Sequence, residues 1–203
     1  MKKQLIISVG REFGSGGHVI AETLAKRFDL PLYDSNILES IAQERNVDAK
    51  TLHRYDEVPR NILFSRRVRE YSTSAEENIA QMQFEYLKKK ADEGESFVVV
   101  GRCSETKLAG TPGLITIFVL GDISVKTARI MKLHNLTEKE AKNMIEKQDR
   151  QRKMYHNYYV KGKWGDSRNY DLSINSSRMG IEKTADFLES YIRERIAESV
   201  QEA

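Results

Sequence analysis

A glycine-rich segment near the start of the sequence has the composition of an anion-binding loop. It reads GREFGSGG from Gly10 to Gly17 and joins a short apolar run, residues 5–9, to an amphipathic stretch, residues 20–28. Between a buried strand and a helix, backbone amides and the helix N-terminus face an anion together, and glycines let the backbone close on a phosphate. The segment therefore predicts a phosphate site, with a merely structural turn as the alternative. The residues expected to bind the phosphates are Arg11, Gly14, Ser15, Gly16, Gly17 and His18.

The loop departs from the common pattern G-x-x-x-x-G-K-[ST] at its lysine. That pattern needs a lysine after its final glycine to reach the outer phosphates and a hydroxyl beyond it to hold magnesium. This sequence has Gly17 and His18 there. Because a lysine ammonium stabilises developing charge in a dry, preorganised site, another cation must replace it or turnover is slow. Guanidinium groups grip phosphate oxygens in pairs, so we favour Arg11 and the arginines of a basic segment farther along the chain.

Two charged residues stand directly after predicted strands. Asp34 ends a short strand, where it would either serve a function at the carboxyl end of the sheet or cap the following helix, and the two roles can coexist. Arg102 follows the apolar run 97–100, and its place at the probable switch region of the sheet favours contact with a phosphate over pairing with a nearby carboxylate. Cys103 is expected to be a small buried residue.

A basic segment with interleaved aromatic rings lies in the second half of the chain. Between Lys147 and Arg168 there are seven basic residues and two acidic ones. Four aromatic residues among them could stack on a base or hold a hinge against the core. We favour contact of this segment with a bound nucleotide. A solvated helix face and a polynucleotide-binding surface are the alternatives.

The elements that would position these residues alternate between strand and helix. Continuous apolar runs bounded by glycines, at 97–100 and 114–120, are typical of strands buried on both faces of a parallel sheet. The pattern predicts an α/β fold of three layers, with a parallel sheet covered by helices on both sides. Capping boxes are expected at Ser74 with Glu77 and at Thr137 with Glu140. Further strands are expected at 5–9, 31–34 and 170–175, and helices at 20–28, 37–44, 74–94, 122–134, 137–159 and 181–196. Residues 48–72 are expected to form short helices and loops.

Length and composition bound the class of protein. With 203 residues, 39% of them hydrophobic and 31% charged, the chain suits one soluble globular domain. A formal net charge of +3 is too small to indicate binding to nucleic acid or to an anionic membrane. One cysteine, and apolar runs far shorter than the roughly 20 residues of a membrane span, favour a cytoplasmic protein. The four histidines show no ligand spacing, so no metal-ligating set is predicted.

Several short motifs occur together in an order that is fairly specific. They are REFGSGG at 11–17, Tyr33-Asp34, Gly101-Arg102, DRQR at 149–152, Trp164-Gly165-Asp166, Tyr170-Asp171-Leu172 and Asn175-Ser176-Ser177. With these motifs, most of the chain resembles the cytidylate kinase-like branch of the P-loop nucleoside monophosphate kinases.

This resemblance implies a single P-loop kinase domain over residues 1–203, with ATP and Mg²⁺ at the glycine loop. It implies a monophosphate acceptor, CMP or dCMP being favoured, beside a helical insert at about residues 36–93. A basic, arginine-bearing lid at about 137–168 would close on the triphosphate. On this hypothesis Arg102, Arg150 and Arg152 act on the transferred group, and Asp34 contacts the acceptor.

Three residues depart from the better-studied cytidylate kinases: Gly17 replaces the lysine, Val19 an expected threonine, and Cys103 an aspartate after Gly-Arg. These departures leave room for a kinase of another small phosphorylated metabolite or another nucleotide. They also leave room for a regulatory protein that binds ATP and transfers nothing. The expected partners are small-molecule nucleotides and no membrane. The last helix could pack on its own sheet or join a homo-oligomer.

Overall fold

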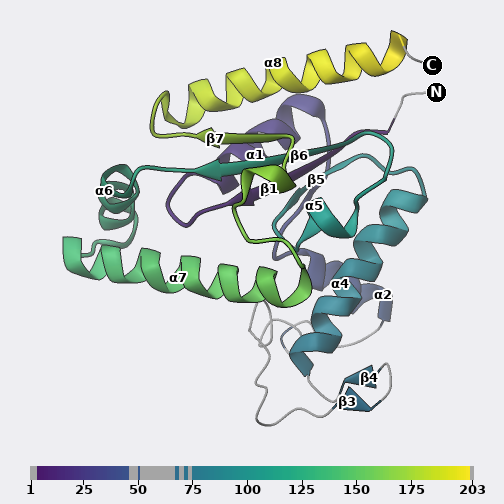
Figure 1. The fold of residues 1–203 in the computed structure, drawn as a ribbon, viewed down its shortest axis with the longest axis horizontal. Coiled ribbons are helices and arrows are strands. Elements are labelled where there is room, and N and C mark those ends of the chain that lie inside the picture. Colours follow the sequence, from purple (N-terminus) through teal and green to yellow (C-terminus); the bar gives the residue numbers. More distant parts are fainter. Residues whose placement is uncertain (1–3, 46–49, 51–66, 69–70, 73–74, 202–203) are drawn as a thin grey trace.

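The computed structural model describes residues 4–45, 50, 67–68, 71–72 and 75–201. In Figure 1, helix α8 (Gly180–Gln201) lies on one side of a parallel sheet and α7 (Glu138–Tyr159) lies on the opposite side. The predicted α/β fold with a parallel sheet is therefore confirmed. Most of the segment 48–72, where we expect short helices and loops, lies outside the described residues, as does Ser74 of the first expected capping box.

The central sheet consists of β1 (Ile6–Arg11), β2 (Leu32–Tyr33), β5 (Phe97–Val100), β6 (Leu114–Leu120) and β7 (Leu172–Asn175). The strand order is β2-β5-β1-β6-β7, and all neighbours run parallel. The chain leaves β1 toward β2 and leaves β5 in the opposite direction, toward β6. The carboxyl ends of β1 and β5 therefore meet at a topological switch point, which is where open α/β sheets bind ligands.

Helices cover both faces of this sheet. On one face, α1 (Gly17–Phe28) and α8 pack against Ile7 and Val9 of β1. On the other, α2 (Ile37–Arg45) and α4 (Ala75–Asp92) pack with Ile6, Phe97 and Val99. Because successive residues of β1 enter different cores, the strand is apolar throughout most of its length, as strands buried on both faces are.

The other described helices lie in the connections between strands. They are α5 (Ser104–Lys107), α6 (Ile123–His134) and the short 3₁₀ turn η1 (Ser167–Asn169). α6 follows β6 directly and packs against α7 at the left of Figure 1. Ile130 of α6 and Ile145 of α7 share a small core, against which Phe13 of the glycine loop packs. The loop is thereby joined to both helices.

Local signals account for most element boundaries. The capping box at the start of α7 is confirmed, since Thr137 N donates to Glu140 Oε2 at 2.9 Å and Thr137 Oγ1 accepts from Glu140 N at 3.4 Å. The small antiparallel pair of β3 (Arg67–Val68) and β4 (Tyr71–Ser72) is not indicated by the sequence, because two-residue strands carry no periodic signal. Among the helices described, none has the length and apolar character needed to cross a bilayer.

Candidate functional site

The glycine loop turns from β1 into α1 through two left-handed residues. Gly14 has φ 80° and Gly16 has φ 83°, a conformation that residues with a Cβ rarely adopt. A Cβ at Gly16 would also lie 2.6 Å from the side chain of Ile181. Alternation between left-handed and ordinary residues gathers successive amides into an anion-binding concavity.

Side chains from several elements donate hydrogen bonds to the carbonyl oxygens of this loop. Carbonyls turned toward an anion would repel it, so holding them elsewhere favours anion binding. The donors are Arg152 Nη1 to Arg11 O (3.4 Å), Ser15 Oγ to Glu12 O (2.8 Å), Arg129 Nη1 to Gly14 O (2.6 Å) and Ser176 Oγ to Ser15 O (2.5 Å). The hydroxyl of Ser15 therefore stabilises the loop itself.

Three amides of the loop are left open to a ligand. Within the described ranges, the N–H groups of Gly14, Gly16 and His18 donate to no protein acceptor. The N-cap residue of α1, Gly16, provides no side-chain cap, so the positive end of the helix dipole faces the same region. The structure thus brings the backbone of the predicted residues, 14–18, together at one helix N-terminus.

Gly17, at the position of the missing lysine, packs directly against Arg11. A Cβ at Gly17 would lie 2.5 Å from Arg11 Cβ and 3.2 Å from Val119 Cβ. The first distance is shorter than two carbon atoms allow, so a side chain at position 17 would displace Arg11. Glycine at 17 and arginine at 11 are therefore complementary.

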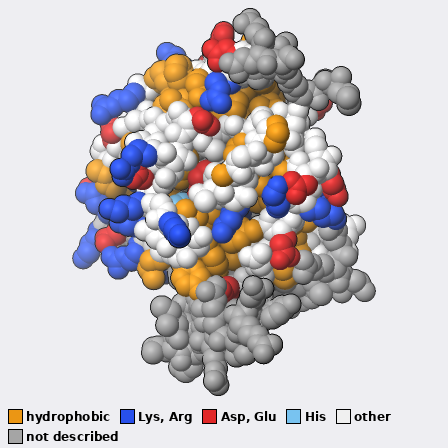
Figure 2. Space-filling model, turned by 45° about the vertical axis from the view of Figure 1, so that its right-hand side comes forward, with side chains coloured by type: hydrophobic (Ala, Val, Ile, Leu, Met, Phe, Trp, Pro, Cys, Tyr) orange, Lys and Arg blue, Asp and Glu red, His pale blue; other side chains and the backbone are white. Residues whose placement is uncertain are grey.

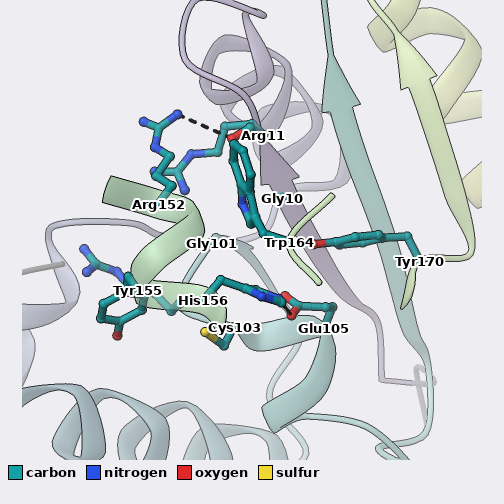
Figure 3. A pocket seen from close by; sticks show the side chains of 11 residues that line it. Gly10, Arg11, Gly101, Cys103, Glu105, Arg152, Tyr155, His156, Trp164 and Tyr170 are labelled. Carbon is teal, nitrogen blue, oxygen red and sulfur yellow. Dashed lines mark hydrogen bonds and ion pairs between the residues drawn. The ribbon is translucent and has the colours of Figure 1, made fainter. Parts of the chain in front are cut away.

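Three arginines line a small cavity between the carboxyl ends of β1 and β5, and Figure 3 labels two of them, Arg11 and Arg152. Arg11 and Arg102 come from the two strand ends, and Arg152 comes from α7. The cavity volume is about 20 Å³, which suits about one water molecule. Several guanidinium groups at one place favour an anion with several oxygens. The other lining residues are Gly10, Gly101, Cys103, Glu105, Tyr155, His156, Trp164 and Tyr170.

The turn that carries Arg102 has a strained backbone. Gly101, Arg102 and Cys103 have φ values of 73°, 59° and 53°, and a left-handed residue other than glycine costs about 1 kcal/mol or more. Ser104 Oγ supports the turn by donating to Gly101 O at 2.7 Å. Arg102 is 4% exposed, and its Nη2 donates to Asp34 O at 3.4 Å. Strain of this kind collects at ligand sites.

A buried glutamate–histidine pair lines the same cavity. Glu105 Oε1 and His156 Nε2 lie 2.8 Å apart, and their side chains are 3% and 5% exposed. Figure 3 shows the pair between α5 and the end of α7. Lys107 Nζ adds a second contact by donating to Tyr159 O at 3.2 Å. These contacts fix the end of α7 and, one turn earlier, Arg152.

Breaking this pair should destabilise the fold. We expect Glu105→Ala to lower the free energy of unfolding by about 3 kcal/mol, because it leaves His156 buried without its partner. Urea denaturation followed by circular dichroism measures the change. Glu138→Ala, which removes an exposed partner of Lys142 on the same helix as His156, is the control and should leave stability unchanged. Equal stabilities for the two variants would contradict the expectation.

Asp34 combines the two roles considered from the sequence. Its Oδ1 accepts from Asn36 N at 2.9 Å, which shapes the turn into α2. Its Oδ2 lies 3.6 Å from His18 Nε2, and the side chain is 23% exposed. The carboxylate therefore borders the start of α1 while it stabilises the turn that follows β2.

The two predicted lid arginines lie on different faces of α7, because residues two apart on a helix point about 200° apart. Arg152 lines the cavity, and its guanidinium lies 5.5 Å from the ring centre of Phe13. Arg150 is 67% exposed and pairs with Glu146 at 2.7 Å. Figure 2 shows lysine and arginine side chains gathered toward one side of the molecule. The structure brings Arg152 to the cavity and leaves Arg150 at the surface.

No sequence pattern indicates three further residues that contact the loop. Lys126 and Arg129 of α6 and Asp149 of α7 approach it from outside. Asp149 belongs to the DRQR motif, but the motif does not show that its carboxylate accepts from Phe13 N at 2.6 Å. Lys126 and Arg129 carry no motif signal, since their partners in the glycine loop, Glu12 and Gly14, are more than 100 residues away in sequence.

Strand order and site together define a P-loop kinase fold, with the glycine loop following the central strand and arginines at the adjoining strand end. The chain belongs to the cytidylate kinase-like family, whose profile matches residues 6–178. Comparison with curated proteins gives no significant match.

Solved structures with the same architecture include proteins of differing similarity. An uncharacterized protein from Eubacterium ventriosum is 38% identical, with 94% of this chain and 99% of that one covered and a TM-score of 0.75. Shikimate kinase from Bacteroides thetaiotaomicron is 13% identical over 93% of this chain and 98% of that one, with a TM-score of 0.55. A gluconokinase from Sinorhizobium meliloti is 12% identical over 100% and 98%, with a TM-score of 0.56. The last two show a shared fold.

Proposed function

We propose that this protein is an ATP-dependent phosphotransferase that moves the γ-phosphoryl group of ATP to a nucleoside monophosphate, with CMP or dCMP as the favoured acceptor. Membership of the cytidylate kinase-like family supports phosphoryl transfer. The observation that carries the proposal is the set of open amides at the start of α1 beside three converging arginines. Phosphoryl transfer requires that the protein position the reacting groups and supply positive charge, and it requires little covalent chemistry from the protein.

On the donor side, the phosphates of ATP would lie against the amides of Gly14, Gly16 and His18. Arg11 would supply the positive charge that a loop lysine supplies in other P-loop kinases. Magnesium, when bound, neutralises charge between the β and γ phosphates. The partly exposed carboxylate of Asp34 fits a hard cation that prefers oxygen ligands, either directly or through a water.

On the transfer side, Arg102 and Arg152 would hold the moving phosphoryl group. Both line a cavity with room for little water, and charges interact more strongly where water is excluded. Arg150 faces solvent, so a part in transfer would require a ligand-bound arrangement in which it turns inward.

The acceptor would lie beside the insert at about residues 36–93, of which α2, β3, β4 and α4 are described. The lid at about 137–168 would be α7 with the segment after it. We propose that these parts form one domain over residues 1–203. A reducing compartment such as the cytoplasm suits the buried thiol of Cys103.

Acceptor-dependent release of ADP tests the proposal. Purified protein with ATP and Mg²⁺ is mixed in turn with CMP, dCMP, UMP, AMP, GMP and a panel of other small phosphorylated metabolites. We expect CMP or dCMP to raise ADP release at least tenfold above the acceptor-free rate. ADP release that no acceptor raises would contradict the proposed reaction.

A nucleotide-binding regulatory protein without transfer activity is the second candidate. Gly17 favours it, because the loop lacks the ammonium that stabilises transfer. Tight binding of ATP or ADP without acceptor-dependent release of ADP would support this function instead.

A further inference from the structure

We propose that Lys126 and Arg129 of α6 are positioning residues that hold the glycine loop in its anion-binding shape. The inference rests on the proposed function, because it takes nucleotide phosphates as the ligand of the loop. The two residues lie about one helical turn apart, and each contacts the loop through a different group.

Lys126 joins the loop to α7 through two carboxylates. Its side chain is 7% exposed, and its Nζ lies 3.0 Å from Glu12 Oε2 and 3.0 Å from Asp149 Oδ2. Glu12 Oε2 also accepts from Gly121 N at 3.1 Å. Asp149 Oδ1 accepts from Phe13 N at 2.6 Å. One buried ammonium thus fixes the carboxylates that orient two consecutive loop residues.

The same ammonium balances charge beside the proposed anion site. Without Lys126, the carboxylates of Glu12 and Asp149 would repel each other and would also repel a bound phosphate. A carboxylate that accepts from a loop amide is compatible with anion binding only when a cation lies next to it. Lys126 meets that condition for Asp149 and also lies next to the carboxylate of Glu12, which accepts from Gly121 N.

Arg129 holds the carbonyl of a left-handed residue. Its Nη1 donates to Gly14 O at 2.6 Å, which keeps that oxygen bonded to α6. Burial lowers the pKa of the Arg129 guanidinium, and no carboxylate among the described residues pairs with it. Its Nη1 also lies 2.9 Å from the place that a Cβ at Gly16 would take. Arg129 therefore adds uncompensated positive charge next to the loop.

These contacts complete a pattern in which the loop carbonyls are bonded outward. Arg152 of α7 takes Arg11 O, the contact drawn in Figure 3, and Ser176 takes Ser15 O. These three donors to loop carbonyls, Arg129, Arg152 and Ser176, all lie outside the loop. The shape of the loop therefore depends on the elements packed around it. The positions of α6 and α7 therefore control the affinity of the loop for phosphate.

Three measurements on the full chain test this inference. They are the exchange rate of the Phe13 amide in nucleotide-free protein, followed by NMR, the affinity for ADP by calorimetry, and the KM values for ATP and for the acceptor in turnover. The variants are Lys126→Met and Arg129→Met, with Lys126→Arg as the conservative rescue. The matched controls are Lys142→Met and Arg193→Met, which remove exposed basic residues paired with Glu138 and Glu189.

We expect Lys126→Met to increase the exchange rate of the Phe13 amide about tenfold. Lys126→Met and Arg129→Met should each weaken ADP binding about tenfold, because each removes hydrogen bonds made by a charged group. Lys126→Arg should recover ADP affinity to within about threefold of wild type, because it restores the charge. In turnover, KM for ATP should rise while KM for the acceptor changes less than about twofold. Both control variants should match wild type.

Wild-type ADP affinity in both Lys126→Met and Arg129→Met would overturn the inference. If Lys126→Met does not fold, the triple variant Lys126→Met, Glu12→Gln and Asp149→Asn also removes the two unpaired carboxylates. This triple variant should fold and still bind ADP about tenfold more weakly than wild type. Wild-type affinity in the triple variant would also overturn the inference. Wild-type protein that binds no ADP would instead overturn the proposed function. Phe13 exchange separates the two failures, because it needs no nucleotide.

Discussion

Arg152→Ala is expected to lower kcat/KM by about 100-fold or more, the size of effect seen when one preorganised donor to a developing charge is removed. Arg152 lines the cavity with Arg11 and Arg102, donates to Arg11 O and lies over the ring of Phe13. Its loss would remove charge from the transferred group and a contact from the glycine loop. Steady-state kinetics with ATP and the best acceptor measure the effect.

Comparison with Arg150→Ala makes this prediction specific to the cavity. Arg150 has the same charge on the same helix but is 67% exposed and pairs with Glu146, so its removal should change kcat/KM by less than about threefold. Arg193→Ala on α8 serves as a distant arginine control. Equal losses in Arg150→Ala and Arg152→Ala would contradict the arrangement of the site.

Gly17→Lys, which restores the usual lysine of the P-loop pattern, is expected to weaken nucleotide binding about tenfold or more. A Cβ at position 17 would lie 2.5 Å from Arg11 Cβ, and overpacking of this kind costs about 1–3 kcal/mol. Arg11 would move out of the cavity, so the protein would lose one cation while it gains another. ADP affinity by calorimetry and the midpoint of thermal unfolding report the two consequences.

The exchange variant Arg11→Gly with Gly17→Lys is the matched control. It removes the side chain that blocks position 17 and keeps one cation in the loop. We expect it to unfold at a higher temperature than Gly17→Lys and to recover most of the ADP affinity. Gly17→Lys that binds ADP more tightly than wild type would show that the two positions are independent.

The strands and the loop could be predicted from the sequence because their signals are local. The runs Phe97–Val100 and Leu114–Leu120 are apolar throughout and bounded by glycines, and each forms a strand over those residues. Thr137 and Glu140 are three residues apart, so the reciprocal hydrogen bonds at the start of α7 follow from spacing alone. The glycines between β1 and α1 likewise indicate a turn with open amides.

The other half of the site depends on contacts between distant residues. Glu105 and His156 form a buried pair across 51 positions, and neither occurs in a motif that indicates it. Arg150 and Arg152 look equivalent in sequence, and only the packing of α7 separates a surface residue from a cavity residue. The contacts of Lys126 with Glu12 and Asp149 form only when α6, the loop and α7 pack together, so they cannot be predicted from the sequence around Lys126.

Titration of ¹⁵N-labelled protein with ADP and Mg²⁺, followed by amide chemical shifts, tests whether the loop binds nucleotide phosphates. Saturable shifts should be largest at Gly14, Gly16 and His18, three amides in the described part of the chain that donate to no protein acceptor. Arg11→Ala should weaken the binding about tenfold or more, as expected for a charged group that contacts phosphate. No shift at these three amides at millimolar ADP, or saturable shifts confined to another surface, would contradict nucleotide binding at the start of α1.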